Sequence, residues 1–436
     1  MSKPLHPDAT VRGNRVTLHW LLLVTTLVLG FVDSVPAEPW NAWGGNARRF
    51  EVAEPLTVQA DRIGELWRTE LGGGKSGIVC DGVSLFTMYA KPAAGDANRF
   101  QEVVVALDPA TGRSRWKYEY EVRKLDGQEA FGGHKPGPQA TPLVEYGVVL
   151  TLGYAGNLNA FDSRTGERLW YYNAVEDFAA TPVQFGFSSS PLPYQGKFVV
   201  LLGGSRGGLV ALDPTTGKVQ WKLPCGEASY ACPVLIQLGG EDQVVFVTRD
   251  YIAGVAAKSG QARWKYPLPE QGLTNVPTPV WLPDNQLLIA GQGTQGVRLL
   301  KLRPAPGAET KVDEVWHNKR IKPFYCNMVV RGDYVFVCAE NITHCLRWAD
   351  GQSCWLKRGY ANSNAILTPG ADLILRGNGT LAVAKLSEEG IDAVAGTKVF
   401  DSRCWTAPTL VSGTLFARNE TEVTAIRLAA PAAADE

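Results

Sequence analysis

The chain has 436 residues, and its 43 lysines and arginines balance its 43 aspartates and glutamates, so that the formal net charge is zero. Without net charge there is no long-range field to attract nucleic acid or an anionic membrane, which argues against a nucleic-acid-binding function. Hydrophobic residues make up 45% of the chain, as in globular proteins that bury a core, and the 46 glycines and 27 prolines predict many turns.

The N-terminus has the pattern of an export signal. Three basic residues within the first 15 precede an apolar stretch over 16–32, and Val35 and Ala37 stand at the two positions of a cleavage site that need short side chains. We expect residues 1–37 to be a signal peptide and the protein to be exported to the periplasm or cell envelope. A retained membrane anchor and a buried helix are the alternatives.

One motif recurs along the chain. Its best copies, Asp108–Trp116 and Asp213–Trp221, read Asp-Pro-x-Thr-Gly-x-x-x-Trp. The aspartate can start a tight turn with its side chain, the proline sets φ at the next position, and the glycine supplies a positive φ. A type I turn followed by a glycine bulge connects the two strands of a hairpin. Five copies keep glycine four residues before tryptophan: Gly112/Trp116, Gly166/Trp170, Gly217/Trp221, Gly260/Trp264 and Gly351/Trp355.

The recurring tryptophan is interpreted as a spacer between neighbouring sheets. A buried tryptophan covers roughly 150–250 Å² of apolar surface, and one residue per repeat is what stacked sheets require. A ladder of aromatic ligand sites is the alternative. The predicted structural positions are Trp67, Trp116, Trp170, Trp221, Trp264, Trp316 and Trp355, and the repeat near 390–400 has lost its tryptophan.

A second marker counts the repeats independently. Short Ser/Thr/Ala-x-Pro segments open another strand at 140–142, 189–191, 231–233, 277–279 and 406–408, with weaker forms at 76–78, 327–329 and 364–366. Repeats of roughly 40–50 residues without helical periodicity are typical of propeller blades. We therefore predict an all-β fold, an eight-bladed β-propeller of four-stranded blades, with a β-solenoid as the alternative.

The ring should close between the two ends of the chain. The segment Glu65–Arg68 has the sequence of an outer strand without its partner, and Ala425–Leu428 that of a third strand without its return strand. Pairing them would complete the eighth blade and leave no open edge there. The expected organisation is a signal peptide (1–37), a lead-in segment (38–64), a propeller (65–428) and a disordered tail (429–436).

In these motifs the chain resembles the pyrroloquinoline-quinone-like (quinoprotein-like) β-propeller repeat family, over roughly residues 40–428. The segment Trp40–Asn46 is also similar to the start of many exported bacterial members. In size the chain is closest to the outer-membrane assembly factor branch, which implies a non-catalytic role. Members of that branch are typically lipoproteins, whereas this chain has no cysteine near the cleavage site to accept a lipid.

The other branch, quinone-dependent dehydrogenases, would imply pyrroloquinoline quinone (PQQ) with calcium. Those enzymes carry two adjacent cysteines, whereas here the pairs nearest in sequence, Cys225/Cys232 and Cys338/Cys345, are separated further. Catalytic members are also usually longer. The resemblance therefore gives no catalytic residue that can be placed on this chain.

Other chemistry finds little support in the sequence. Four of the eight cysteines fall between Cys326 and Cys354, but not as paired Cys-x-x-Cys motifs, and the five histidines form no zinc motif, so that we predict no metal site. The cysteines could form disulfides in an exported protein or be free buried thiols. The glycine-rich segment Gly203–Gly208 precedes a predicted strand, which favours a turn over a phosphate-binding loop.

The loops that lead into the innermost strands of a propeller, called the mouth loops below, gather around the central channel. Their polar side chains could form a funnel for a ligand or peptide, or simply a solvated mouth. Several are basic, which suits an anionic ligand or an acidic peptide better than a metal ion. The candidate ligand-binding residues are His134, Lys135, Ser188, Ser189, Tyr230, Asn275, Lys322, Asn327, Asn362, Asn364, Arg403 and Trp405.

The resulting hypothesis is a non-catalytic, monomeric, exported propeller. It would bind a protein or peptide partner in the cell envelope, in a scaffold or assembly role. No cofactor, no nucleic-acid partner and no transmembrane domain after signal cleavage are expected. The alternative is a quinone-dependent alcohol or sugar dehydrogenase with PQQ and calcium, for which the acids Glu227, Glu270 and Asp401 lie near the mouth loops.

Overall fold

The structure is a computed structural model. It describes residues 39–58, 63–93, 95–96, 98–125, 136–268, 276–291, 295–305, 308–323 and 325–428. All of these lie in one compact unit, residues 37–436. The expected signal peptide and the C-terminal tail therefore lie outside the described residues.

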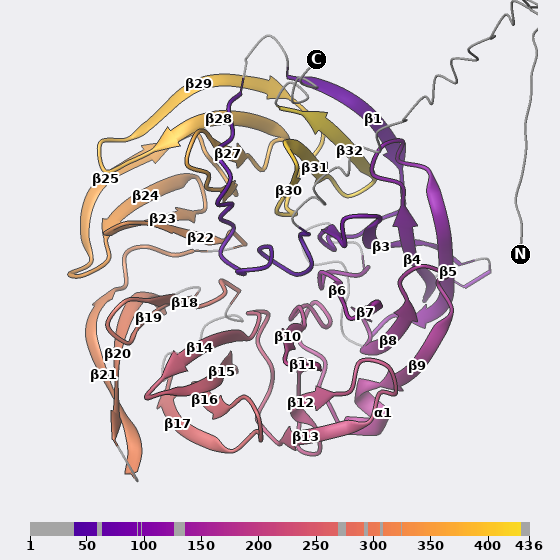
Figure 1. Ribbon diagram of the computed structural model, residues 1–436, viewed down its shortest axis with the longest axis horizontal. Helices are drawn as coiled ribbons and strands as arrows, with labels where there is room; N and C mark the ends of the chain where they lie inside the picture. The colour runs from indigo at the N-terminus through magenta and orange to yellow at the C-terminus, as the bar shows by residue number, and fades with distance from the viewer. Residues whose placement is uncertain are drawn as a thin grey trace, which may run out of the picture. The chain divides into compact units, whose positions relative to one another are not determined.

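Eight four-stranded antiparallel sheets form a ring, so that the predicted eight-bladed β-propeller is confirmed (Figure 1). In each blade the first strand is short and lies innermost, and the following strands lie progressively further out. The eighth blade combines the last three strands, β30 to β32, with β1, the first strand of the chain, which is the outermost strand of this blade.

The first four blades and the single described helix have the following bounds. Blade 1 comprises β2 (Val79–Cys80), β3 (Leu85–Pro92), β4 (Arg99–Leu107) and β5 (Ser114–Arg123); blade 2 comprises β6 (Leu143–Glu145), β7 (Val148–Leu152), β8 (Asn157–Asp162) and β9 (Arg168–Asn173), followed by α1 (Ala174–Phe178); blade 3 comprises β10 (Leu192–Tyr194), β11 (Lys197–Gly203), β12 (Gly208–Leu212) and β13 (Val219–Leu223); blade 4 comprises β14 (Val234–Leu238), β15 (Glu241–Val247), β16 (Tyr251–Ala256) and β17 (Ala262–Pro267). Within this described part, the helix is too short to cross a membrane.

The remaining blades follow the same plan. Blade 5 comprises β18 (Val280–Leu282), β19 (Gln286–Gly291), β20 (Gly296–Ala305) and β21 (Ala308–Asn318); blade 6 comprises β22 (Met328–Arg331), β23 (Tyr334–Ala339), β24 (Ile342–Arg347) and β25 (Gln352–Arg358); blade 7 comprises β26 (Asn364–Ile366), β27 (Asp372–Leu375), β28 (Thr380–Leu386) and β29 (Ile391–Lys398); blade 8 comprises β30 (Thr409–Val411), β31 (Thr414–Arg418), β32 (Glu422–Arg427) and β1 (Gly64–Glu70).

The recurring turn joins the third and fourth strands of a blade. In blade 3 the Asp213 side chain accepts hydrogen bonds from the amides of Thr215 (3.1 Å) and Thr216 (2.8 Å), and Gly217 follows with φ +70°. A bulge between Ala211 and its neighbour follows in the pairing of β12 with β13. The residue order of the motif therefore matches the backbone geometry that this hairpin requires.

The repeat tryptophans lie on the outer strands, and six of the seven bond to the next blade. The indole nitrogen of Trp170 donates to the carbonyl of Pro214 in the following blade (2.7 Å), and Trp221 does the same to Ala257 (3.1 Å). Trp67, Trp116, Trp316 and Trp355 make equivalent bonds to the next turn. Trp264 differs: it donates to Gln243 within its own blade, because the hairpin of β20 and β21 is longer than the repeat turn.

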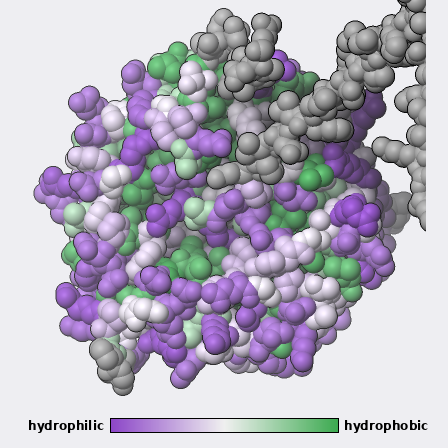
Figure 2. Space-filling view, viewed as in Figure 1, coloured by the Kyte–Doolittle hydropathy of each residue, from purple (hydrophilic) through white to green (hydrophobic). Residues whose placement is uncertain are grey.

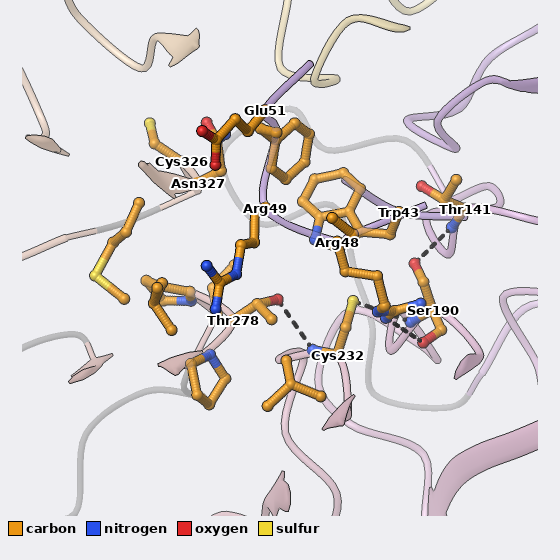
Figure 3. A pocket seen from close by; sticks show the side chains of 18 of the residues that line it. Trp43, Arg48, Arg49, Glu51, Thr141, Ser190, Cys232, Thr278, Cys326 and Asn327 are labelled. Atoms are coloured by element: carbon orange, nitrogen blue, oxygen red, sulfur yellow. Dashed lines mark hydrogen bonds between the residues drawn. The ribbon is translucent and has the colours of Figure 1, made fainter. Parts of the chain in front are cut away.

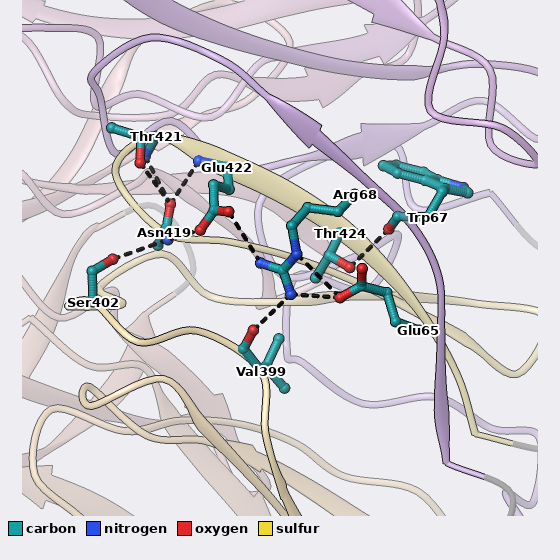
Figure 4. A network of polar contacts seen from close by, with 9 residues as sticks. All are labelled: Glu65, Trp67, Arg68, Val399, Ser402, Asn419, Thr421, Glu422 and Thr424. Carbon is teal, nitrogen blue, oxygen red and sulfur yellow. Dashed lines mark hydrogen bonds and ion pairs between the residues drawn. The ribbon is translucent and has the colours of Figure 1, made fainter.

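The eighth blade closes as the sequence predicted. β1 pairs antiparallel with β32, with Trp67 opposite Ala425. Arg68 of β1 forms ion pairs with Glu65 and Glu422 and donates to the Val399 carbonyl of blade 7 (Figure 4). Both edges that the chain ends would expose are therefore paired.

Blade 8 also holds blade 1 through one buried arginine. The Arg418 side chain is 1% exposed, and its guanidinium donates to the carbonyls of Gly74, Ser76 and Met88 and to the Thr87 hydroxyl. Burial lowers the pKa of Arg418 to about 10. The group stays charged at neutral pH, and its cost of desolvation is offset by oxygen acceptors instead of a carboxylate.

All eight cysteines are free thiols, six of them buried. The sequence left disulfides and free buried thiols as alternatives, and the structure has free thiols. The segment Gly203–Gly208 is the turn between β11 and β12, as predicted.

Candidate functional site

The channel at the centre of the ring holds a cavity of about 740 Å³. Two parts of the chain line it: the mouth loops with the innermost strands, and residues 43–51 of the lead-in segment (Figure 3). Around this cavity the face is mixed, with apolar surface inside a largely hydrophilic rim (Figure 2).

The lead-in segment crosses the channel and is fixed to blades on both sides. Trp40 pairs with Cys80 at the end of β2, and the amide of Val52 and the carbonyl of Phe50 bond to Leu367 just after β26 (2.9 and 2.8 Å). These contacts lie at or beyond the ends of innermost strands, whereas the mouth loops precede those strands. The innermost strands of all repeats run in the same direction along the channel, so that they begin at one end of it and finish at the other. The lead-in therefore forms the floor of the channel, at the end opposite the mouth loops.

A belt of hydrogen bonds connects the starts of the innermost strands. The amide of Thr141 donates to Ser190 Oγ (2.9 Å), the amide of Ser190 to Cys232 Sγ (3.3 Å), and the amide of Cys232 to Thr278 Oγ1 (3.2 Å) (Figure 3). Asn327 and Asn364 continue the pattern between blades 6 and 7 (3.0 Å). Each side chain satisfies an amide of the preceding blade, so that the belt fixes the positions of the mouth loops.

Aromatic and basic side chains gather at the mouth of the channel. Tyr325 stacks on Trp405 with ring centroids 5.0 Å apart and planes inclined by 21°. The Lys75 ammonium lies 5.1 Å and the Arg403 guanidinium 4.9 Å from the centre of a Trp405 ring. These four residues, called the mouth cluster below, come from loops of blades 1, 6 and 8. Burial is the main cause of a lowered pKa for Lys75.

Two adjacent arginines of the lead-in form the floor. Arg48 donates to the carbonyls of Pro191 (2.6 Å) and Ser190 (3.5 Å), and Arg49 donates to the carbonyl of Trp281 (3.0 Å). Burial lowers the pKa of Arg48. In this floor the guanidiniums bond to carbonyl oxygens of blades 3 and 5, which fixes them without neutralising their charge.

The cavity does not match a calcium–quinone site. Calcium needs six to eight oxygen ligands. Among the described residues around the cavity, Glu51 is the single carboxylate, against Arg48, Arg49, Lys75 and Arg331. The amide of Asn327 is already bonded to blade 7, and the two lining cysteines, Cys232 and Cys326, belong to different blades. The described lining therefore suits an anion better than a cation.

The structure brings five of the sequence-predicted residues together. Ser188, Tyr230, Asn327 and Trp405 line the cavity, and Arg403 lies over Trp405. Ser189 and Asn364 are buried in contacts between blades, while Lys322 and Asn362 lie outside the lining. His134, Lys135 and Asn275 lie outside the described residues.

Several lining residues escaped the sequence reasoning. The lead-in residues Trp43, Arg48 and Arg49 were assigned to no site, because a segment before the first blade shows no repeat that would place it. Thr141, Cys232 and Thr278 belong to the Ser/Thr/Ala-x-Pro segments, which were used only to count strands. Their hydroxyl and thiol groups were the available indication of the belt.

Fold, repeated turn and tryptophan spacers define an eight-bladed β-propeller whose repeats are similar to PQQ-like repeats. A family model described as outer membrane protein assembly factor BamB matches residues 57–234. The matched region covers blades 1 to 3 and the start of blade 4.

Two sequence relatives are named as dehydrogenases. The 1-butanol dehydrogenase (cytochrome c) of Thauera butanivorans is 28% identical over 221 residues, which cover 47% of this chain and 29% of that protein. The quinohemoprotein alcohol dehydrogenase ADH-IIG of Pseudomonas putida is 31% identical over 131 residues, covering 28% of this chain and 17% of that protein. The matches thus span less than a third of these relatives.

Solved structures show the same fold in both kinds of protein. BamB from Moraxella catarrhalis superimposes with a TM-score of 0.56 at 16% identity, covering 84% of this chain and 98% of that chain. The quinohemoprotein alcohol dehydrogenase ADHIIG from Pseudomonas putida HK5 gives a TM-score of 0.61 at 15% identity, covering 92% and 81%. At these identities the likeness concerns the fold.

Proposed function

We propose that this chain is a non-catalytic exported β-propeller that binds a protein or peptide partner of the cell envelope, in a scaffold or assembly role. The observation that carries the proposal is the mouth cluster, in which Tyr325 stacks on Trp405 and both Lys75 and Arg403 lie over a Trp405 ring. Tryptophan, tyrosine and arginine are the residue types that contribute most binding energy at protein interfaces.

The cluster is held in place before any partner arrives. Thr406, next to Trp405, donates to the Lys75 carbonyl (3.0 Å), and the Asn364 side chain donates to the Trp405 carbonyl (3.3 Å). A preorganised aromatic surface loses little conformational freedom on binding. The basic groups around it favour an acidic segment of the partner.

A dehydrogenase is the second candidate, because one sequence relative is a 1-butanol dehydrogenase (cytochrome c) and another is a quinohemoprotein alcohol dehydrogenase. The donor set around the cavity argues against it: one carboxylate among the described lining residues is too few to hold calcium beside a quinone. Incubation with PQQ and calcium tests this candidate directly. An absorbing cofactor and dye reduction with simple alcohols or sugars would overturn the non-catalytic assignment.

The binding role is tested with the purified mature chain immobilised on beads. Proteins captured from an envelope extract are identified by mass spectrometry, and the leading one is purified and titrated. We expect Trp405→Ala and Arg403→Glu to weaken binding of that protein at least tenfold. Tyr171→Ala is the control, since this tyrosine is 41% exposed on the outer strand β9. Equal loss in the control, or none in the mouth variants, would contradict the proposal.

A further inference from the structure

The floor of the channel contains positive charge that lacks a counter-ion. Neither Arg48 nor Arg49 forms an ion pair with any carboxylate of the described chain, and their hydrogen-bond acceptors are the neutral carbonyls of Ser190, Pro191 and Trp281. Glu51 follows two residues later but extends away from the Arg49 guanidinium (Figure 3). Burial makes an uncompensated charge unfavourable at Arg48, whereas the Arg49 side chain is exposed.

Two hydrogen-bond donors on the same floor are also unused. Arg48 Nε and the indole nitrogen of Trp43 are buried from solvent and have no hydrogen-bond acceptor. Both side chains line the cavity; the Arg48 guanidinium extends toward Ser190, whereas the Arg49 guanidinium extends toward the other side of the cavity (Figure 3). Buried N–H groups without acceptors are rare in native proteins, and each calls for an explanation.

The walls above this floor are largely apolar. Phe185, Val276, Trp281 and Met328 line the cavity, whose volume of about 740 Å³ lies in the range of small-molecule sites. The Trp43 indole N–H and the Arg49 guanidinium offer donors to the oxygens of a carboxylate, and Arg48, which already uses its terminal nitrogens on carbonyls, adds a second positive charge to the floor. An apolar body attached to the carboxylate would then cover the walls.

We infer that the channel floor is a binding site for a carboxylate that carries an apolar body, held by Arg48, Arg49 and the Trp43 indole. This site goes beyond the proposed partner-binding function, because it uses the lead-in segment and not the mouth cluster. The carboxylate could belong to a free organic acid or to the C-terminus of a peptide, since both present the same chemistry to the floor.

Octanoate and 1-octanol are a matched pair of probes that differ in the charged end group. Calorimetric titration of the mature wild-type chain should show binding of octanoate, and 1-octanol should bind at least tenfold more weakly. Trp43 and Trp281 line the cavity, so that their fluorescence gives a second readout. Equal binding of both probes, or binding of neither octanoate nor the peptide below, would overturn the inference.

Arg49→Met is the main variant, because this side chain is exposed and its loss should leave the fold intact. We expect it to weaken octanoate binding at least fivefold, and Arg48→Met at least tenfold, with near-ultraviolet circular dichroism as the check on folding. Arg206→Met is the control: it is exposed on a loop and bonds to the Glu176 carbonyl. An Arg49→Met protein that binds octanoate as wild type does would refute the assignment.

The second arm identifies the source of the carboxylate. An acetylated apolar tetrapeptide is titrated with a free C-terminus and as the C-terminal amide. Tighter binding of the free peptide than of octanoate assigns the site to a chain end, and tighter binding of octanoate assigns it to an organic acid. These probes need no envelope partner, so the result is independent of whether Trp405→Ala affects partner binding.

Discussion

Gly217 lies flat against the indole ring of Trp170 in the preceding blade, and a Cβ at position 217 would come within 2.7 Å of that ring. The same relationship joins Gly112 to Trp67 and Gly260 to Trp221. The glycine of the repeat therefore has two functions: it adopts the positive φ of the turn, and it gives the neighbouring tryptophan a flat surface on which to pack.

Gly217→Ala should separate these two functions from each other. Gly196 has nearly the same φ, +73° against +70°, and nothing lies within 4 Å of its added Cβ. We expect Gly196→Ala to lower the free energy of unfolding by about 1 kcal/mol through backbone strain alone. Gly217→Ala should cost about 1–3 kcal/mol more, because the methyl group overpacks the Trp170 contact. Urea denaturation measures both, and equal losses would show that packing plays no part.

Trp221→Ala should destabilise the propeller by about 3–5 kcal/mol, as truncation of a core aromatic does. This indole is 9% exposed and donates to the Ala257 carbonyl of the next blade. Trp221→Phe keeps a ring and loses that bond, so that about 1 kcal/mol of loss is expected from the missing hydrogen bond, besides any change in packing. A Trp221→Ala protein within about 1 kcal/mol of wild type would support the aromatic ligand ladder instead.

Glu102 should make stability depend on pH. Its carboxyl group is fully buried, accepts from the Tyr120 hydroxyl (2.6 Å) and the Tyr154 amide (2.8 Å), and has its pKa raised by burial to about 7. The folded state thus holds a proton that the unfolded state releases near pH 4.5. The stability from this proton is complete below pH 4.5 and disappears as the pH rises through 7.

Glu102→Gln removes this titration. The free energy of unfolding of wild type relative to Glu102→Gln should fall by up to about 3 kcal/mol between pH 4.5 and 8. Denaturation curves at several pH values provide the measurement. Glu119→Gln, an exposed change on β5, should leave the pH dependence of wild type unaltered. Parallel curves for wild type and Glu102→Gln would contradict a buried titrating carboxyl group.

Arg418→Met should weaken the contact between blades 8 and 1. Methionine fills part of the space but leaves the buried carbonyls of Gly74, Ser76 and Met88 without their donor, which should cost about 3–5 kcal/mol. Arg427→Met, exposed on β32, is the matched control and should stay within about 0.5 kcal/mol of wild type. Thermal and urea unfolding compare the two variants. Similar free energies of unfolding would show that the buried arginine contributes little to stability.

Export can be tested at the N-terminus. We expect cleavage after Ala37, so that N-terminal sequencing of the exported protein starts at Glu38. Ala37→Lys should block processing because the site needs a small side chain. A chain that starts at Met1 in the membrane fraction would favour the anchor.

The blades of this molecule could be predicted because the turn and spacer residues of each repeat lie close together in the sequence. In five hairpins a glycine stands four residues before a tryptophan, as Gly217 does before Trp221, and this spacing reveals turn and spacer together. Closure through β1 and β32 followed because two incomplete repeats at the chain ends complement each other. Local chemistry and repeat count were sufficient for these features.

Features that depend on a single long-range contact could not be predicted in the same way. Arg418 donates a hydrogen bond to a residue more than three hundred positions away in the sequence. The sequence around Arg418 contains no motif that would indicate its burial. Arg48 and Arg49 look like ordinary surface charges in the sequence, since only the folded ring places the lead-in across the channel. The site therefore emerges from tertiary structure, whereas the blades emerge from the repeat.

The pairing of β1 with β32 also has a consequence during synthesis. β1 leaves the ribosome before any blade exists, yet its partner β32 follows only after all strands of blades 1 to 7. Until then, β1 and the outer edge of β31 both expose unpaired backbone groups, which are templates for association with other chains. A chain truncated before Glu422 would keep these edges permanently and would be prone to aggregate, because β32 is the strand that covers both.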